Sequence, residues 1–194
     1  NHIVIFKHGQ YFIGNDNVSL ILGDNIFHGI PRIKMDFKGS LVFAYEVTNP
    51  WDYAVVQFEG EKIKQIVEKP KEFISSYAIP GLYFFDNKVI NYSKTLKPSK
   101  RGELEITDII NIYLGNNSID VIKFPRGTAW LDAGQPDTLF QSAAYVTIQE
   151  RQGIRIGCIE EECYNKGFID KNQLKKVVDK LPNSEYKYYL QKYE

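Results

Sequence analysis

Residues 18–22 (VSLIL) form a short, nearly continuous apolar run that stops at Gly23, Asp24 and Asn25. A run of this length and composition is typical of a β-strand buried on both faces, as the strands of parallel sheets are. Open α/β sheets bind their ligands at the carboxyl ends of such strands. The run therefore predicts an α/β fold and places Asp24 where a ligand would bind.

Further strand and helix patterns alternate along the chain. Residues 53–67 predict a β-hairpin, because the second arm alternates polar and apolar residues after the turn Glu59-Gly60-Glu61. Other strands are predicted at residues 41–47, 79–85 and 119–124, and helices at about 104–114 and 136–152 and after the capping residues Asp170 and Ser184.

This alternation predicts one α/β domain with a mixed, mostly parallel sheet flanked by helices. We place that domain at residues 1–155. A C-terminal helical segment is predicted at residues 156–194, and its tyrosine-rich end suggests a packing or subunit-contact surface.

Charge balance and cysteine content narrow the classes of function. Lys and Arg total 24, and Asp and Glu also total 24, so no net field attracts nucleic acid or an acidic membrane. No apolar run approaches the length of a membrane span, and no secretory signal opens the chain. Cys158 and Cys163 form neither a CxxC pair nor a disulfide framework. We therefore expect a cytoplasmic protein.

Two aspartates follow apolar segments in a similar way. Asp24 ends the first predicted strand, and Asp132 stands between an apolar pair and a small-residue turn that opens a helix. Each has a structural alternative, since Gly-Asp-Asn is good turn sequence and a carboxylate near a helix start is favourable in itself. Two such carboxylates could instead share one Mg²⁺, which takes one or two carboxylates and adds water and phosphate oxygens.

Two basic segments supply candidates for phosphate binding. In Glu68-Lys69-Pro70 the proline is expected to hold Lys69 extended, and the lysine offers a compact positive charge. Arg101 precedes a flexible glycine just before a predicted helix, where its guanidinium could clamp a phosphate through two hydrogen bonds. The alternative for both segments is ordinary solvated surface charge.

Six segments together resemble the sugar-1-phosphate nucleotidylyltransferases. The strings LGDN and RGELEITD in this order are the most specific, and the similarity runs from about residue 12 to the end. It is greatest to members that join dTTP with glucose 1-phosphate, including the helical C-terminal segment of their long form. The segments are LGDNIF (22–27), YAVVQF (53–58), EKP (68–70), YAIPGLYFFD (77–86), KPSKRGELEITDI (97–109) and AWLDAG (129–134).

The resemblance implies a Rossmann-like nucleotidyltransferase fold that forms dTDP-glucose and pyrophosphate from dTTP and glucose 1-phosphate, with Mg²⁺ as cofactor. It implies that Asp24 and Asp132 ligate Mg²⁺ and that Lys69 and Arg101 act in catalysis by binding the sugar phosphate. It also implies a homo-oligomer, a tetramer, that supplies deoxysugar synthesis for cell-surface polysaccharide. The other substrate contacts are expected from Glu68 to a sugar hydroxyl and from Tyr53, Gly81 and Tyr83, whereas Trp130 is expected to pack beneath the metal loop.

The chain departs from the family pattern on its N-terminal side. The family's N-terminal third, with its glycine-rich nucleotide loop and base-reading segment, has no counterpart, and no GxGxxG or GxxxxGK replaces it. We therefore expect a fold that is incomplete at the N-terminus and a longer natural protein. Because base choice resides in that segment, a UTP-using enzyme stays open as an alternative. So does a non-catalytic sugar-phosphate-binding or assembly module.

Overall fold

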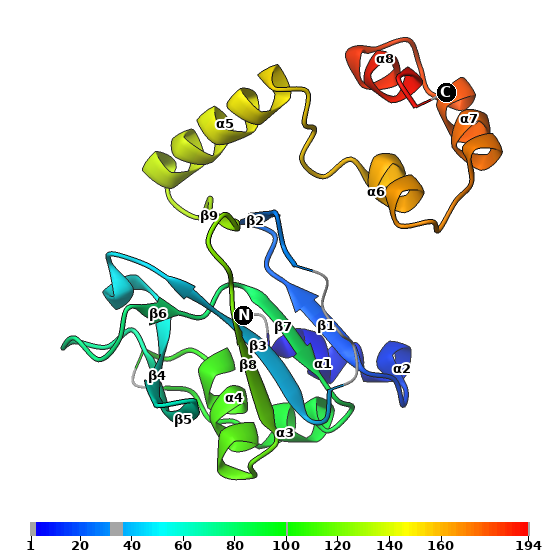
Figure 1. Cartoon of the computed structure of the whole chain (residues 1–194). Helices are drawn as coiled ribbons and strands as arrows, with labels where there is room; N and C mark the ends of the chain where they lie inside the picture. The colour runs from blue at the N-terminus through cyan, green and yellow to red at the C-terminus, as the bar shows by residue number, and fades with distance from the viewer. Residues whose placement is uncertain (1–2, 32–36, 100, 194) are drawn as a thin grey trace. The chain divides into compact units, whose positions relative to one another are not determined.

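The computed structural model describes residues 3–31, 37–99 and 101–193. The chain divides into two compact units, Asn1–Ser142 and Ala143–Glu194. The first combines a sheet with helices, and the second is helical (Figure 1). The domain boundary that we placed after residue 155 stays a prediction.

The first unit is built on a mixed sheet, seven-stranded in the part of the chain that the structure describes. The order is β1, β7, β3, β6, β4 and β5, with β8 beside β3, and a separate ribbon pairs β2 with β9. The strands are β1 (Val18–Ile21), β2 (Asn25–His28), β3 (Ser40–Glu46), β4 (Ala54–Glu59), β5 (Lys62–Glu68), β6 (Tyr77–Ala78), β7 (Leu82–Phe85), β8 (Ile119–Lys123) and β9 (Ala129–Asp132).

The strand directions correct the sequence prediction. Of the described pairs, only β3 and β8 run parallel, and the others are antiparallel. The prediction of a mostly parallel sheet is therefore wrong. The tight turn at Gly60 joins β4 to β5, which only antiparallel neighbours permit, whereas the chain enters β8 from helices. An apolar run indicates burial on both faces and carries no information on strand direction.

β1 is also less buried than its apolar sequence predicted. Leu20 belongs to the core and is 9% exposed, whereas Ile21, which points to the opposite face, is 58% exposed. β1 stands at the end of the strand order, beside β7. The prediction that this strand is buried on both faces is therefore wrong.

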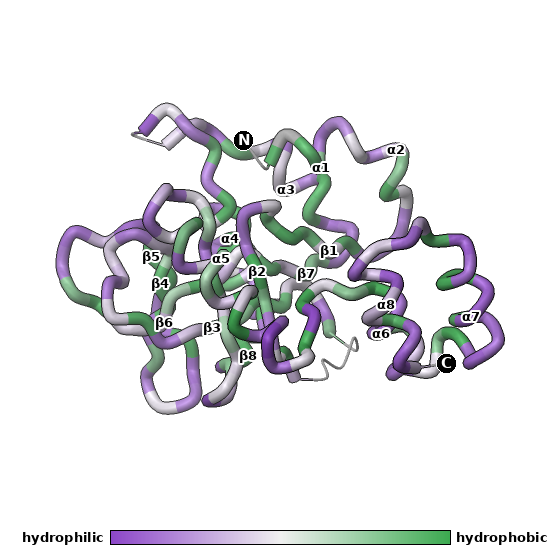
Figure 2. Tube along the Cα trace, turned by 90° about the horizontal axis from the view of Figure 1, so that it is seen from above, coloured by the Kyte–Doolittle hydropathy of each residue, from purple (hydrophilic) through white to green (hydrophobic). Residues whose placement is uncertain are grey.

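β3 shows how the centre of the sheet is covered on both faces. Val42 and Ala44 pack in one cluster with residues of three helices, while Leu41 and Phe43 pack in another cluster on the opposite face. Figure 2 shows these apolar stretches along the central strands, with hydrophilic residues in the loops. The helices of this unit are α1 (Val4–His8), α2 (Gln10–Ile13), α3 (Val89–Thr95) and α4 (Ile106–Gly115), and α5 (Pro136–Arg151) begins in it.

The second unit is a small helical cluster whose capping residues were predicted correctly. Asp170 forms a capping box at the start of α7, and Ser184 accepts a hydrogen bond at the start of α8. None of the described helices is long and apolar enough to cross a membrane. The helices are α6 (Ile159–Asn165), α7 (Lys171–Lys180) and α8 (Glu185–Gln191), and they meet around Leu174, Val178 and Leu190.

Gly39 leads into β3 in a conformation that other residues avoid. Its φ is +87°, and a Cβ here would lie 2.0 Å from the backbone oxygen of Ser118. We expect Gly39→Ala to lower the free energy of unfolding by more than the roughly 1–3 kcal/mol that a positive φ alone costs. Gly60→Ala is the matched control, because Gly60 has a φ of +64° but open space around its Cβ. Equal losses for the two variants in urea titrations would contradict the steric explanation.

Candidate active site

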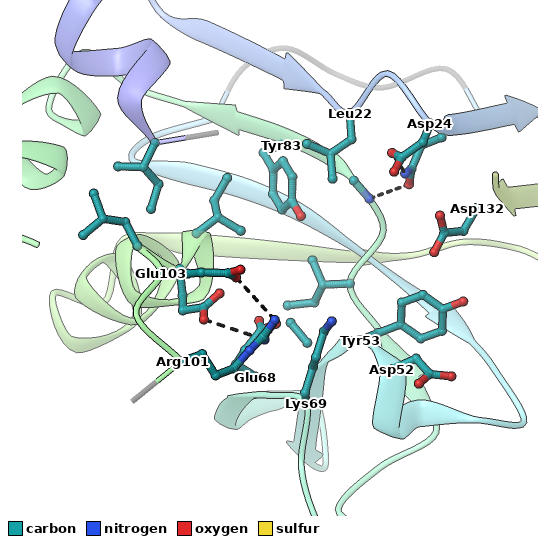
Figure 3. Close-up of a pocket in the computed structure, with 18 of the residues that line it drawn as sticks. Leu22, Asp24, Asp52, Tyr53, Glu68, Lys69, Tyr83, Arg101, Glu103 and Asp132 are labelled. Carbon is teal, nitrogen blue, oxygen red and sulfur yellow. Dashed lines mark hydrogen bonds and ion pairs between the residues drawn. The ribbon is translucent and has the colours of Figure 1, made fainter. Parts of the chain in front are cut away.

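One pocket of the first unit collects residues from all six segments that carry the family resemblance. It has a volume of about 400 Å³ and lies where β1 and β5 end and α4 begins (Figure 3). Every site residue predicted from the sequence lines it, while the role assigned to each stays a prediction. Those residues are Asp24, Tyr53, Glu68, Lys69, Gly81, Tyr83, Arg101, Trp130 and Asp132.

Asp24 and Asp132 approach each other because β2 and β9 pair. Asp24 precedes β2, and Asp132 ends β9 directly opposite Asn25. The backbone N–H of Ala133 donates to the carbonyl of Asp24 at 2.7 Å. A Cβ at Gly134 would lie 3.1 Å from one carboxylate oxygen of each aspartate. Both oxygens therefore border one small space, which the glycine leaves open.

This donor set suits a hard cation that brings other ligands with it. Mg²⁺ takes one or two carboxylates from a protein and completes its octahedron with water and phosphate oxygens. Within residues 3–31, 37–99 and 101–193, no group of three or more His, Cys, Asp or Glu side chains is arranged to hold a metal. The two aspartates therefore fit a shared Mg²⁺ and do not fit a closed zinc site, which needs four ligands.

Arg101 lies among three carboxylates before α4. Its guanidinium nitrogens are 3.6 Å from Glu68, 3.3 Å from Glu103 and 3.7 Å from Glu105. The arginine side chain is 45% exposed, and exposed ion pairs contribute little to folding stability. The carboxylates hold the guanidinium at the pocket wall, where its remaining N–H groups can reach an anion.

Lys69 has a backbone conformation that its sequence did not predict. Its φ is +39°, in the left-handed region, although a residue before proline is expected to be extended. The prediction of an extended Lys69 is therefore wrong. Its N–H donates to the carbonyl of Tyr53 at 3.0 Å, which ties the turned residue to the start of β4. Figure 3 shows its side chain pointing into the pocket.

Glu68 is held by Thr107, a contact that the sequence did not predict. The hydroxyl of Thr107, in the first turn of α4, donates to one carboxylate oxygen of Glu68. Thr107 is 1% exposed, and a buried hydroxyl needs a hydrogen-bond partner. The other oxygen of Glu68 faces Arg101. Thr107 lies within the RGELEITD string, but nothing in the sequence pairs it with Glu68.

Two tyrosines present neutral hydroxyls along the pocket. The ring of Tyr53 contacts that of Trp130, with centroids 4.9 Å apart. Burial raises the pKa of Tyr53, and the charges of Asp132 and Asp52 raise it further. Burial also raises the pKa of Tyr83, strongly. Both hydroxyls therefore stay protonated at neutral pH and can donate to ligand oxygens.

Two other pocket residues were missed. Asn25 bonds to three neighbours across the pocket rim. Asp52 lines the pocket from a short 3-10 helix, η1 (Pro50–Asp52), and accepts a hydrogen bond from Asn49 at 2.8 Å. Asn25 is adjacent to Asp24 in the LGDN string, but its sequence position fits a turn equally well.

The fold and the pocket define a nucleotidyl transferase domain. The family model described as nucleotidyl transferase matches residues 5–149, and the chain belongs to this family. Within it, the chain is 45% identical over 193 residues to the glucose-1-phosphate thymidylyltransferase of Mycolicibacterium smegmatis, covering 95% of this chain and 67% of the relative. It is 41% identical to the enzyme of that name from Neisseria meningitidis, covering 94% and 66%.

These relatives confirm both the family resemblance and the prediction of an enzyme class. The chain spans about two thirds of the length of the curated relatives.

Solved structures agree with this assignment. A Bacillus anthracis protein assigned as a glucose-1-phosphate thymidylyltransferase, crystallised with a sucrose, is 38% identical with a TM-score of 0.66, covering 75% of this chain and 60% of that one. A UDP-glucose pyrophosphorylase in complex with UDP-glucose is 26% identical with a TM-score of 0.61, covering 71% and 58%. The nucleotidyltransferase part of the predicted fold is thereby confirmed.

Proposed function

We propose that the protein forms dTDP-glucose and pyrophosphate from dTTP and glucose 1-phosphate, and that this chain supplies the sugar-phosphate and metal-binding side. The observation that carries the proposal is the presence of two carboxylates, Asp24 and Asp132, and two cations, Lys69 and Arg101, in one pocket. Its volume of about 400 Å³ is within the range of small-ligand sites. The names of the two relatives from Mycolicibacterium smegmatis and Neisseria meningitidis support the choice of substrates.

On the sugar side, Arg101 and Lys69 bind the phosphate through charge-assisted hydrogen bonds and hold its attacking oxygen in line with the α-phosphorus of the nucleotide. Glu68, fixed by Thr107, accepts a hydrogen bond from a sugar hydroxyl. These side chains accelerate transfer by placing the two reactants and balancing their charge, so the step needs no proton shuttle.

On the metal side, Asp24 and Asp132 would hold Mg²⁺ through the oxygens that border the space beside Gly134. Mg²⁺, when bound, supplies positive charge to the phosphate oxygens that become more negative during transfer. The two aspartates would thereby supply that charge in the same pocket as Arg101 and Lys69.

A UTP-using enzyme is the second candidate. The structural likeness to a UDP-glucose pyrophosphorylase in complex with UDP-glucose favours it. The sugar side of the pocket does not distinguish a dTTP-using from a UTP-using enzyme, because the residues described above are proposed to contact the sugar and its phosphate rather than the base.

A nucleotide panel tests the proposal. The natural protein that contains this chain is incubated with glucose 1-phosphate, MgCl₂ and dTTP, UTP or ATP, and pyrophosphate release is measured. Fastest release with dTTP is the expected result, and fastest release with UTP would assign the second candidate. Calorimetric binding of glucose 1-phosphate without release from any nucleotide would identify a non-catalytic module.

We also propose that the protein is a cytoplasmic homo-oligomer, a tetramer. α5 carries large apolar side chains that are more than half exposed, as a contact with another copy requires. They are Leu139, Phe140 and Ile148. Cys158 and Cys163 are free thiols, as in a reducing compartment. Light scattering measures the subunit number, and a monomeric mass would contradict the assembly.

A further inference from the structure

The side chain of Asn25 bonds to three separate segments of the pocket. Its Nδ2 donates to Oδ1 of Asp24 at 2.8 Å. Its Oδ1 accepts from the backbone N–H of Gly81 at 3.0 Å and from Nε1 of Trp130 at 2.6 Å. One amide therefore connects the loop after β1, the loop before β7 and strand β9.

This pattern leaves the amide a single orientation. Because two N–H donors face Oδ1, that atom must be the carbonyl oxygen, and the NH₂ group must face Asp24. The close packing around Gly81 strengthens the arrangement. A Cβ at Gly81 would lie 2.6 Å from Cγ of Leu22 and 2.8 Å from Oδ1 of Asn25.

The two oxygens of Asp24 consequently have different surroundings. Oδ1 is held by Asn25, and Oδ2 is the oxygen that lies 3.1 Å from the Cβ position of Gly134. On the other strand, Oδ1 of Asp132 accepts from the N–H of Gly134 and borders the same position. The hydrogen bond from Asn25 thus turns Oδ2 of Asp24 toward the space that it shares with Asp132.

We propose that Asn25 is a positioning residue, which aims Asp24 toward Asp132 so that both carboxylates can hold one divalent cation. The inference rests on the proposed function, since it assumes that these aspartates bind Mg²⁺. Trp130 takes part through its indole N–H, which helps to fix the amide. Hydrogen-bond partners of metal ligands typically change metal affinity by roughly 10–100-fold when they are removed.

Titration with Mn²⁺, followed by the electron paramagnetic resonance of the free ion and with Mg²⁺ as competitor, tests the proposal on the full chain. We expect Asn25→Ala to raise the Kd for Mn²⁺ by roughly 10–100-fold. Trp130→Phe keeps an aromatic ring but removes the N–H, so we expect a smaller increase. The effects of the two changes should be less than additive, because both act through one amide.

Asn49→Ala is the matched control. It removes another hydrogen bond of 2.8 Å from an asparagine to an aspartate, in this case Asp52, which is not one of the two proposed metal ligands. We expect it to leave the Kd for Mn²⁺ unchanged. The melting temperature of each variant is measured in parallel. If Asn25→Ala does not fold, Trp130→Phe tests the proposal alone. The proposal then requires that folded Trp130→Phe have a higher Kd for Mn²⁺ than the wild type.

The possible results separate the inference from the proposed function. A wild-type chain that binds no Mn²⁺ would overturn both. A wild-type chain that binds Mn²⁺, with Trp130→Phe and folded Asn25→Ala both binding as tightly as Asn49→Ala, would overturn the positioning role alone. Turnover of folded Asn25→Ala that recovers as Mg²⁺ is raised would support it, because excess cation compensates for a weakened site and not for a damaged fold.

Discussion

Replacing either Asp24 or Asp132 by asparagine is expected to lower nucleotidyl transfer by at least about a hundredfold. Each change removes one of the two negative charges that border the space beside Gly134, and so one of the two proposed ligands of Mg²⁺. Asparagine has nearly the same shape as aspartate, so the pocket keeps its form. Pyrophosphate release measured across a series of Mg²⁺ concentrations checks this prediction.

The same two variants are expected to fold at least as well as the wild type in the absence of metal. Two carboxylates that border one small space repel each other, so losing one charge removes an unfavourable interaction. Asp120→Asn, at an exposed position of β8, is the matched control and should change neither turnover nor melting temperature. Full turnover in Asp24→Asn or Asp132→Asn would contradict the metal-site proposal.

Much of the local structure could be predicted from the sequence because it depends on neighbouring residues. The hairpin around Gly60 and the helix starts at Asp170 and Ser184 follow from alternation and capping, which act over a few residues. Strand direction depends on the route of the chain between distant segments. The apolar run at residues 18–22 showed that a strand was there and did not show that it would run antiparallel to β7.

In the pocket, too, features that depend on neighbouring residues could be predicted, whereas contacts between distant segments could not. Asp24 and Asp132 were singled out because each follows an apolar segment, and the structure brings them together through the pairing of β2 with β9. Asn25 and Thr107 were missed, although each lies in a recognised string. Each forms a hydrogen bond with a residue 39 to 105 positions away, such as the bond that Trp130 donates to Asn25, and no local pattern contains those contacts.

Lys69 is the opposite case, in which a reliable local rule fails. Steric contact with Pro70 favours an extended residue, yet Lys69 has a φ of +39°. Non-glycine residues in sparsely populated backbone regions cost on the order of 1–3 kcal/mol, and they collect at functional sites. In this conformation the N–H of Lys69 donates a hydrogen bond to the carbonyl of Tyr53, and its side chain points into the pocket. The local backbone strain is therefore accompanied by a positive charge placed in the pocket.

Arg101→Met is expected to raise the Kd for glucose 1-phosphate by roughly ten- to a hundredfold, as the loss of hydrogen bonds to a charged group does. The guanidinium lies 3.3–3.7 Å from the carboxylates of Glu68, Glu103 and Glu105. Without it, these three charges repel the sugar phosphate as well as one another.

Folding stability should fall only slightly in the same variant, because the arginine side chain is 45% exposed and solvent screens both its ion pairs and the repulsion between the carboxylates that remain. Arg101→Lys keeps the charge but loses the planar fork, so we expect a Kd between those of the wild type and Arg101→Met. Arg126→Met, at an exposed position outside the pocket, controls for the loss of one positive charge. If calorimetry gives Arg101→Met the same Kd as Arg126→Met, Arg101 does not bind the phosphate. Lys69 would then be the cation that does, because it is the other positively charged side chain lining this pocket among the described residues.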